Sequence, residues 1–334
     1  MMSPLSNDQR KYLIDSSQIY ESYIEARRHA DTYRHGMTWK QAGGREYLFR
    51  LSGRTGYGKS LGPRSPETER ILQEFREGKA RAQERLEGLT QRLDQLAKIN
   101  RALRLGRVPT VVAKLLRALD ERDMMGDEFM VLGTQALFAY ESVAGVRIDP
   151  QLTSSGDVDL MYDTRKRLSI TSGKLDGAGL IGLLRKIDKS FEPMRSNTFR
   201  AANKEEFMVD LIIPERDMRE SEPIRFVEGD LVATEVPGLQ WLMNSPKFDA
   251  VCIGEDGWPT RMVVPDPRAF SVHKYWLSTR PDREPLKKPR DAGQAEIVRQ
   301  ITLEYFPHLT FDNESMQYLP HPMRRLGLGT ADAE

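Results

Sequence analysis

Two aspartates separated by one residue constrain this chain more than any other feature. Asp157 and Asp159 lie in residues 130–163, where the pattern predicts a short apolar strand, a turn at Gly133 and Thr134, a helix, a polar loop and a second strand. Side chains alternate faces along a strand, so the two carboxylates are expected on one face, roughly 6.5 to 7 Å apart. Like charges on one face are costly without a cation between them. A pair of divalent ions, about 3.5 to 4 Å apart, is the usual solution.

Length and composition narrow the possible classes of protein. The 334 residues suffice for two domains, or for one domain with an extension. Charged residues make up 30% and hydrophobic residues 39% of the chain, which predicts a soluble protein. The net charge of +1 does not indicate a general nucleic-acid coat, although a local basic patch remains open. The N-terminal residues lack a signal-peptide core, and no window approaches the roughly 18 apolar residues of a membrane span.

The cysteine and histidine content argues against two other kinds of site. The single cysteine, Cys252, excludes an intrachain disulfide and favours a cytoplasmic location. Because it lies between Val251 and Ile253, we expect it to be a buried apolar residue and not a catalytic thiol. The five histidines show no metal-ligand spacing, so a zinc site is not expected.

The N-terminal third is predicted to be a helical arm that carries a β-hairpin near residues 45–60. A mixed-charge helix is expected up to about residue 38, and residues 45–51 have the content of a strand. A second, long helix is predicted from Ser65, with Pro66 at its first position, to about residue 105. Its apolar residues form one stripe, which indicates packing against a partner helix or a dimerisation arm.

Residues 53–60, GRTGYGKS, match the phosphate-binding loop pattern GxxxxGK[ST]. That loop works only where a helix begins at its Lys-Ser, because the helix N-terminus and the loop amides cradle the phosphates. Here Gly62 and Pro63 follow closely and prevent a helix from running on from Lys59. We therefore favour a glycine-rich hairpin tip, whose basic residues Arg54, Lys59 and Arg64 can still contact a polyanion.

The remainder alternates strands and helices. Strands are predicted at 128–132, 158–162, 197–202 and 206–213, the last two as a hairpin, and helices at 108–122, 134–143, 175–189, 239–244, 268–277 and 291–305. The predicted fold class is α+β, a small mixed sheet flanked by helices with a long N-terminal helical arm and a helical C-terminal region. The predicted domains are 1–125 (arm), 126–235 (core) and 236–334 (mainly helical).

A third aspartate extends the candidate site. Asp210 lies in the apolar run 207–213, FMVDLII, where it shares a strand face with Met208 and Ile212. An ionised carboxylate inside such a strand is expensive unless it is paired or bound to metal. Asp210 is therefore predicted as a third metal ligand. Nearby basic residues, Arg200 among them, are candidates to contact phosphates or a nucleic-acid acceptor, although most are interpreted as ordinary surface charge.

The order of these motifs resembles the DNA polymerase beta-like nucleotidyltransferase superfamily. More narrowly, GTQALFAYE (133–141) with GDVDLMYD (156–163) resembles its bacterial branch of abortive-infection-type toxin nucleotidyltransferases, over roughly residues 128–213. The resemblance implies the nucleotidyltransferase fold and metal binding by Asp157, Asp159 and Asp210. It also implies that Gly133 and Thr134 contact the terminal phosphates of a nucleoside triphosphate (NTP). Threonine in place of the family's serine keeps the hydroxyl, whereas the gap from the turn to the aspartates is longer than in the commonest members.

We extend the resemblance to two later helices, where toxin-like members place a Lys and then an Asp. Lys274 is the candidate to neutralise the triphosphate, with a surface salt bridge as the equal alternative. Asp291 is expected either to position this lysine or to cap its own helix.

The implied reaction is in-line transfer of a nucleoside monophosphate from an NTP to an acceptor hydroxyl. Mg²⁺, or Mn²⁺, suits an all-carboxylate site completed by phosphates. The sequence leaves the acceptor open among tRNA, a protein or a small molecule. Two other interpretations are a degenerate member of the fold that binds a nucleotide or a partner without catalysis, and an interaction protein that forms a homo-oligomer through its arm.

Overall fold

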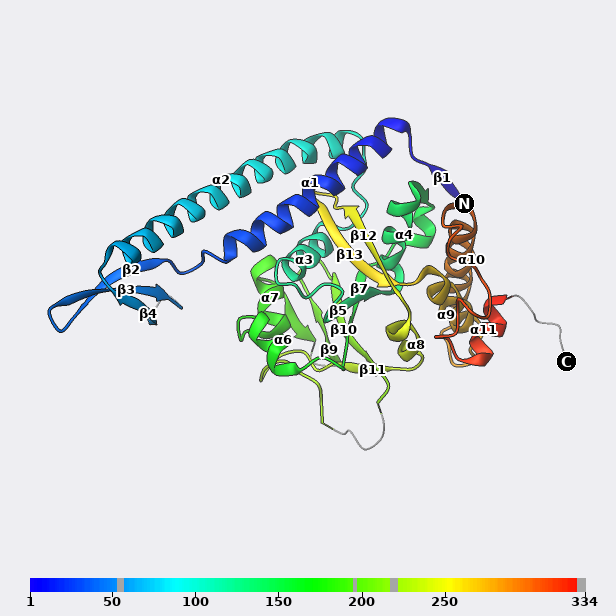
Figure 1. Ribbon diagram of the computed structural model, residues 1–334. Coiled ribbons are helices and arrows are strands. Elements are labelled where there is room, and N and C mark those ends of the chain that lie inside the picture. Colours follow the sequence, from blue (N-terminus) through cyan, green and yellow to red (C-terminus); the bar gives the residue numbers. More distant parts are fainter. Residues whose placement is uncertain (53–56, 195–196, 217–221, 329–334) are drawn as a thin grey trace. The chain divides into compact units, whose positions relative to one another are not determined.

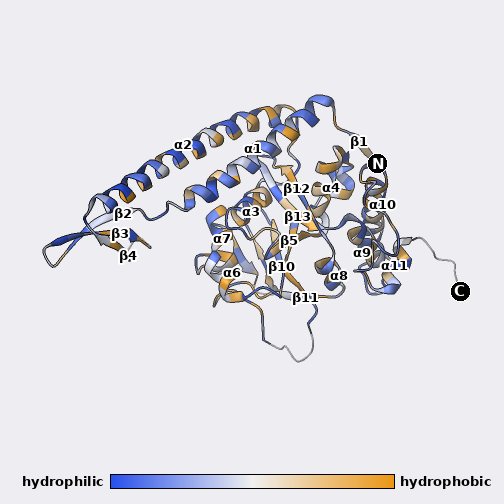
Figure 2. Ribbon diagram, viewed as in Figure 1, coloured by the Kyte–Doolittle hydropathy of each residue, from blue (hydrophilic) through white to orange (hydrophobic). Residues whose placement is uncertain are grey.

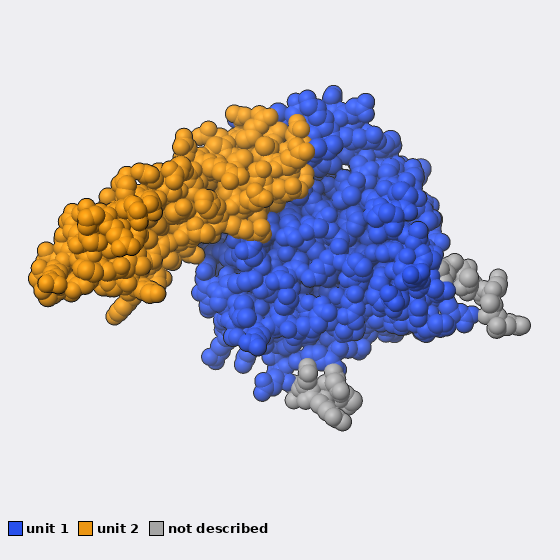
Figure 3. All heavy atoms as spheres, in the orientation of Figure 1, with its two compact units in different colours: residues 1–14, 97–334 blue, residues 15–96 orange. Residues whose placement is uncertain are grey.

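The computed structural model describes residues 1–52, 57–194, 197–216 and 222–328. Contacts divide the chain into two compact units, shown in separate colours in Figure 3. Unit 1 comprises Met1–Ile14 and Ala97–Glu334, and unit 2 comprises Asp15–Leu96. Two helices, α1 (Asn7–Asp31) and α2 (Pro66–Ala102), run from one unit into the other.

Unit 2 is a pair of antiparallel helix segments with a small sheet at one end of the pair (Figure 1). Figure 1 shows α1 and α2 side by side. Glu25 of α1 faces Arg85 of α2, and the ring of Tyr33, just after α1, lies 5.3 Å from the ring of Phe75 on α2. Phe75, one residue of the apolar stripe predicted on α2, thus packs against Tyr33 of the same chain. The sheet has the order β2-β3-β4, with β2 (Met37–Ala42), β3 (Arg45–Leu51) and β4 (Gly58–Pro63).

Two expectations for this unit need correction. The first helix was expected to reach about residue 38, yet α1 ends at Asp31 and residues 37–42 form a strand. His35 and Gly36 both adopt positive φ, 72° and 71°, a left-handed conformation that a helix cannot continue through. Only a hairpin was predicted, whereas the sheet has three strands.

The phosphate-loop match lacks the context that such a loop requires. Lys59 and Ser60 lie within strand β4, so no helix begins there. Residues 53–56, which include Arg54, lie outside the described residues. The hairpin interpretation of this segment is consistent with the strand that follows.

Unit 1 is built around a mixed sheet of six strands. Their order is β5-β7-β10-β9-β8, with β11 beside the second half of β10. The strands are β5 (Phe129–Leu132), β7 (Asp157–Tyr162), β8 (Glu192–Met194), β9 (Asn197–Ala202), β10 (Met208–Pro214) and β11 (Thr234–Val236). β7 and β10 are parallel, and β9 and β10 form the predicted hairpin. Strand β10 is central and almost wholly buried, as its apolar sequence predicts.

Helices pack on both sides of the strands of unit 1. They are α3 (Thr110–Asp120), α4 (Leu137–Ala144), α5 (Pro150–Thr153), α6 (Leu168–Lys174), α7 (Gly179–Ile187), α8 (Leu239–Asn244), α9 (Pro267–Thr279), α10 (Lys288–Tyr305) and α11 (His321–Leu328). A short 3₁₀ helix, η1 (Gly133–Ala136), connects β5 to α4. Figure 2 shows hydrophobic residues concentrated on the strands, whereas α2 alternates hydrophilic and hydrophobic residues. The α+β fold class, with a small mixed sheet, a long N-terminal helix and a helical C-terminal region, is confirmed.

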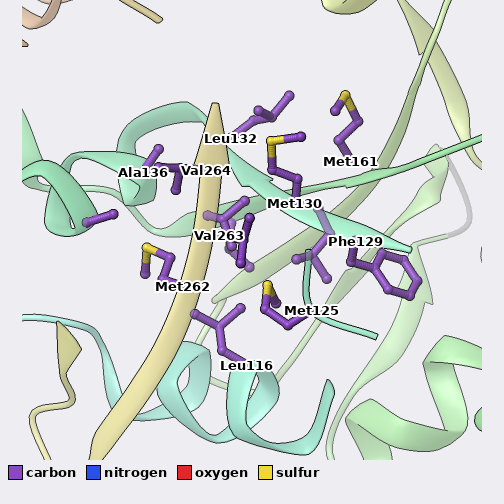
Figure 4. Packing of buried hydrophobic residues seen from close by; sticks show 14 of the residues in the cluster. Leu116, Met125, Phe129, Met130, Leu132, Ala136, Met161, Met262, Val263 and Val264 are labelled. Carbon is purple, nitrogen blue, oxygen red and sulfur yellow. The ribbon is translucent and has the colours of Figure 1, made fainter. Parts of the chain in front are cut away.

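The structure contains two strand pairs that were not predicted, an antiparallel hairpin in the C-terminal region and a pair that involves the N-terminal strand. The hairpin is β12 (Lys247–Ile253) with β13 (Pro259–Pro265), and the pair is β1 (Met2–Pro4) with β6 (Val146–Ile148). In Figure 4, Met262 and Val263 of β13 lie among buried side chains of β5 and α3, so the hairpin completes the core. Cys252 is buried and unpaired by any disulfide, as predicted. Within the described residues, no helix is both long and apolar enough to cross a membrane.

Candidate active site

The three predicted aspartates lie on neighbouring strands at the centre of the sheet. In the parallel pairing of β7 with β10, Asp159 is directly opposite Asp210, and Asp157 is opposite Met208. Residues opposite each other share a face, and so do alternate residues of one strand, so all three carboxylates project from the same face. Asp157 and Asp159 are half-buried, and Asp210 is only 5% exposed.

The carboxylate of Asp210 is paired with an arginine. On the other side of β10, Arg200 of β9 is its register partner. The Nε of Arg200 donates to Oδ1 of Asp210 at 2.6 Å, and the second guanidinium nitrogen donates to Oδ2 at 2.5 Å. This bidentate pair raises the pKa of Arg200, chiefly through the hydrogen bonds to Asp210. The cost of burying Asp210 is therefore met by an arginine that we had interpreted as surface charge.

Asp159 carries negative charge that its surroundings do not fully compensate. Burial, followed by repulsion from Asp157 and Asp210, raises its pKa from 3.8 to about 6, while Lys274 and Arg200 act in the opposite direction. This combination of desolvation and like charges marks a position that favours a proton or a metal cation.

The side chains present fit a divalent cation at Asp157 and Asp159. Mg²⁺ in phosphoryl-transfer sites is held by one or two carboxylates plus substrate phosphates, and oxygen ligands of this type suit it. Over the part of the chain that is described, no group of three or more His, Cys, Asp or Glu side chains is arranged to hold a metal ion. In this structure the carboxylate of Asp210 is paired with Arg200.

The turn before α4 approaches the aspartates closely. Gly133 adopts φ of +63°, and a Cβ at this position would collide with the carboxylate of Asp159. Only glycine satisfies both conditions without strain. The side-chain amide of Gln135 donates to the backbone carbonyl of Asp157 at 3.1 Å. The turn is thus fixed directly against the strand that carries the paired aspartates.

The hydroxyl of Thr134 is buried and already oriented. It accepts a hydrogen bond of 3.2 Å from Nε2 of Gln294 on α10, whose amide also donates to the carbonyl of Leu152 at 2.7 Å. Because this hydroxyl accepts from Gln294, its own proton remains available for donation to another acceptor, such as a phosphate oxygen.

Lys274 belongs to a buried charge cluster and not to a surface salt bridge. Its Nζ donates to Oδ1 of Asp291 at 2.9 Å, and Arg283 binds the other oxygen of Asp291 at 2.7 Å. Burial lowers the pKa of Lys274, whereas Asp291 and then Asp159 raise it, which ties this lysine electrostatically to the aspartates. Asp291 lies in the first turn of α10 and binds these side chains, so of the two roles considered for it, positioning the lysine is the one observed.

A family model of nucleotidyltransferases matches residues 110–320, which is most of unit 1. The chain belongs to this nucleotidyltransferase family. The matched region includes the turn at Gly133, all three aspartates and Lys274. No curated protein and no solved structure matched the chain. A nucleotidyltransferase takes an NTP as its donor, so the family identifies the general activity and the donor class.

Sequence patterns located most of these residues but missed their partners. The Gly-Thr turn and the Asp-x-Asp strand are local motifs and were visible. Arg200 was named only as one of several nearby basic residues, and Gln294 was not identified, because neither lies in a motif. A signal for Arg200 did exist: an arginine in the hairpin partner of a strand with a buried aspartate is a candidate for cross-strand pairing.

Proposed function

We propose that this chain transfers a nucleoside monophosphate from an NTP to an acceptor hydroxyl and releases pyrophosphate. The observation that carries the proposal is that Asp157, Asp159 and Asp210 lie on one face of the sheet. The turn at Gly133 lies beside them, where a Cβ would collide with the carboxylate of Asp159. Membership of a nucleotidyltransferase family supports the reaction class.

In this proposal Asp157 and Asp159 hold the divalent cations. Mg²⁺ or Mn²⁺, when bound, supplies neutralisation of phosphate charge and a template for in-line displacement. Asp210 orients the acceptor hydroxyl and can accept its proton once Arg200 has moved away. Arg200, then without its carboxylate, is positioned to pair with a phosphate oxygen, because guanidinium groups bind carboxylate and phosphate with the same geometry.

Thr134 and Lys274 complete the proposed donor site. The Thr134 hydroxyl, held by Gln294, donates to a terminal phosphate oxygen. Lys274 supplies the ammonium group that neutralises the triphosphate in this proposal. Its ion pair with Asp291 favours the charged form of this buried side chain. Arg283 shares Asp291, so Lys274 can turn toward a phosphate without leaving that carboxylate unpaired.

The direct test measures binding of each of the four NTPs by thermal stabilisation, with and without Mg²⁺ or Mn²⁺. Wild-type protein should be stabilised by at least one NTP in a metal-dependent manner, and the Asp157→Ala/Asp159→Ala variant should not. No metal-dependent shift with any NTP would contradict the proposal. Incubation with labelled NTPs and a cell extract then identifies the molecule that acquires the label.

The toxin-like branch suggested by the resemblance forms part of the same proposal. A toxin of this kind should arrest growth when it is expressed in a bacterium, and the Asp157→Ala variant should not. Normal growth with active wild-type enzyme would assign the chain to another branch. The degenerate alternative would be favoured only by NTP binding without any transfer of label.

A further inference from the structure

The three-stranded sheet of unit 2 has two faces of different character. In the antiparallel register, Trp39 is opposite Leu48, and Lys40 is opposite Tyr47. Neighbouring pairs alternate between the two faces of the sheet. The face that contains Leu48 is called the inner face below, and the face that contains Tyr47 the outer face.

The inner face is already used for packing within unit 2. Leu48 is fully buried. Arg50, also on this face, donates to the backbone carbonyl of Thr32 and lies over the ring of Phe75 on α2, 4.3 Å from its centroid. This face is therefore occupied by the helices and is not available to a partner.

The outer face presents two aromatic rings side by side. Tyr47 and Phe49 are two residues apart on the central strand β3, so both point outward, roughly 6.5 to 7 Å apart along the backbone. They line a surface hollow of about 690 Å³ together with Arg45 and Ser60. Lys40 extends over the ring of Phe49, with Nζ 5.0 Å from its centroid.

The outer face carries positive charge at Lys40 and Arg45, which share it with the two rings, whereas Arg50 and its register partner Lys59 belong to the inner face. Residues 37–64 contain a single acidic residue, Glu46. The carboxylate of Glu46 is paired with Arg64 at 2.6 Å. Glu46 lies two residues before Leu48 on β3, so it belongs to the inner face. The outer face therefore combines stacking surfaces with cations and has no carboxylate among its strand residues.

We propose that the outer face of this sheet binds single-stranded nucleic acid. Bases of any identity stack on exposed aromatic rings of a sheet, and basic residues beside the rings bind the phosphates. Tyr47 and Phe49 would each support one base, and Lys40 and Arg45 would contact the backbone between them. Naming this nucleic acid as the acceptor of the nucleotidyl group rests on the proposed function, whereas the binding itself does not.

A second copy of this chain is the other occupant to consider for a face whose two aromatic rings, Tyr47 and Phe49, are half-buried. Two copies meeting through this face would bring their lysines and arginines together without a carboxylate on either face to compensate. Charge thus favours a polyanion over a like-charged copy, and the oligomeric state becomes an outcome of the test.

The test uses the full chain and a fluorescent single-stranded RNA of about ten nucleotides, within the site size of such surfaces. Fluorescence anisotropy is measured without NTP or metal. The Tyr47→Ala/Phe49→Ala variant should lose about 30-fold or more in affinity, because each stacked base contributes about 1 to 3 kcal/mol. Tyr275→Ala, which removes an exposed aromatic residue from α9, is the matched control and should bind as wild type.

A second series separates phosphate contacts from stacking. Lys40→Gln and Arg45→Gln should each reduce the slope of log affinity against log salt by about 0.7, the value for one phosphate contact on a single strand. Arg76→Gln, an exposed arginine of α2, should leave the slope unchanged. Circular dichroism checks that every variant is folded.

Three results would overturn the proposal: affinity that is unchanged in the double aromatic variant, preference for a duplex over the single strand, or a dimer that these substitutions dissociate. The Asp157→Ala/Asp159→Ala variant keeps the two hypotheses separate. It should bind RNA as wild type does while it loses metal-dependent NTP binding. RNA binding without any transfer of label would leave this inference intact and refute only the acceptor assignment.

Discussion

The pairing of Arg200 with Asp210 leads to a quantitative prediction. Arg200→Met removes the guanidinium and leaves a buried carboxylate without its partner. Breaking a buried ion pair costs about 3 to 5 kcal/mol. Because the Arg200 side chain is 24% exposed and that of Asp210 is 6% exposed, water can reach the pair from one side, and we expect a loss of about 3 kcal/mol.

This loss is measured by denaturant unfolding and by the melting temperature. For a unit of this size, about 3 kcal/mol corresponds to a fall of roughly 6 °C. Lys166→Met is the control, because its pair with Asp127 is exposed and such pairs contribute about 1 kcal/mol or less. Millimolar Mn²⁺ should restore part of the stability of Arg200→Met, since the unpaired Asp210 then becomes available to a cation.

The double variant decides whether the two residues are coupled. In an Asp210→Asn background, Arg200→Met should cost about 1 kcal/mol or less, because no buried charge is left unpaired. Equal losses in both backgrounds would show that Arg200 stabilises the sheet by packing alone. Asp210 would then not be a carboxylate that becomes available when Arg200 moves away.

Three further predictions concern the candidate site and the phosphate-loop match. In denaturant unfolding, Gly133→Ala should cost about 1 to 3 kcal/mol of stability, because it combines positive φ with a collision at Asp159, and it should also weaken metal binding. The control is Gly173→Ala, in a helix with open space around its α-carbon, which should be neutral or stabilising in the same assay. The raised pKa of Asp159, about 6, means that the folded protein binds this proton more tightly than the unfolded chain, so stability is lost as the pH rises from about 4 to 6. The unfolding free energy of wild type relative to that of Asp159→Asn should fall by up to about 3 kcal/mol over that range. A difference that does not change with pH would contradict the burial of Asp159 beside Asp157 and Asp210. Lys59→Ala should leave NTP affinity unchanged in calorimetry while Lys274→Met lowers it; the reverse result would restore the phosphate-loop interpretation.

The sequence by itself determined the features that depend on neighbours along the chain. The alternation of a strand places Asp157 and Asp159 on one face wherever that strand lies. Pro66 at the first position of a helix and an apolar stripe predict α2 to within a few residues, since capping and periodicity are local properties. The buried strand around Asp210 was equally visible from its run of apolar residues.

Only the tertiary structure decided what those residues contact. Arg200 neutralises Asp210 because the register of two antiparallel strands places them opposite each other, and a shift of one residue would have turned the arginine to the other face. Lys274, 115 positions after Asp159, acts to lower the pKa of Asp159 because the fold brings its ammonium group near this carboxylate. Sequence patterns report on local conformation, whereas the partners of buried charges are set by which elements pack together, and those contacts lie far apart along the chain.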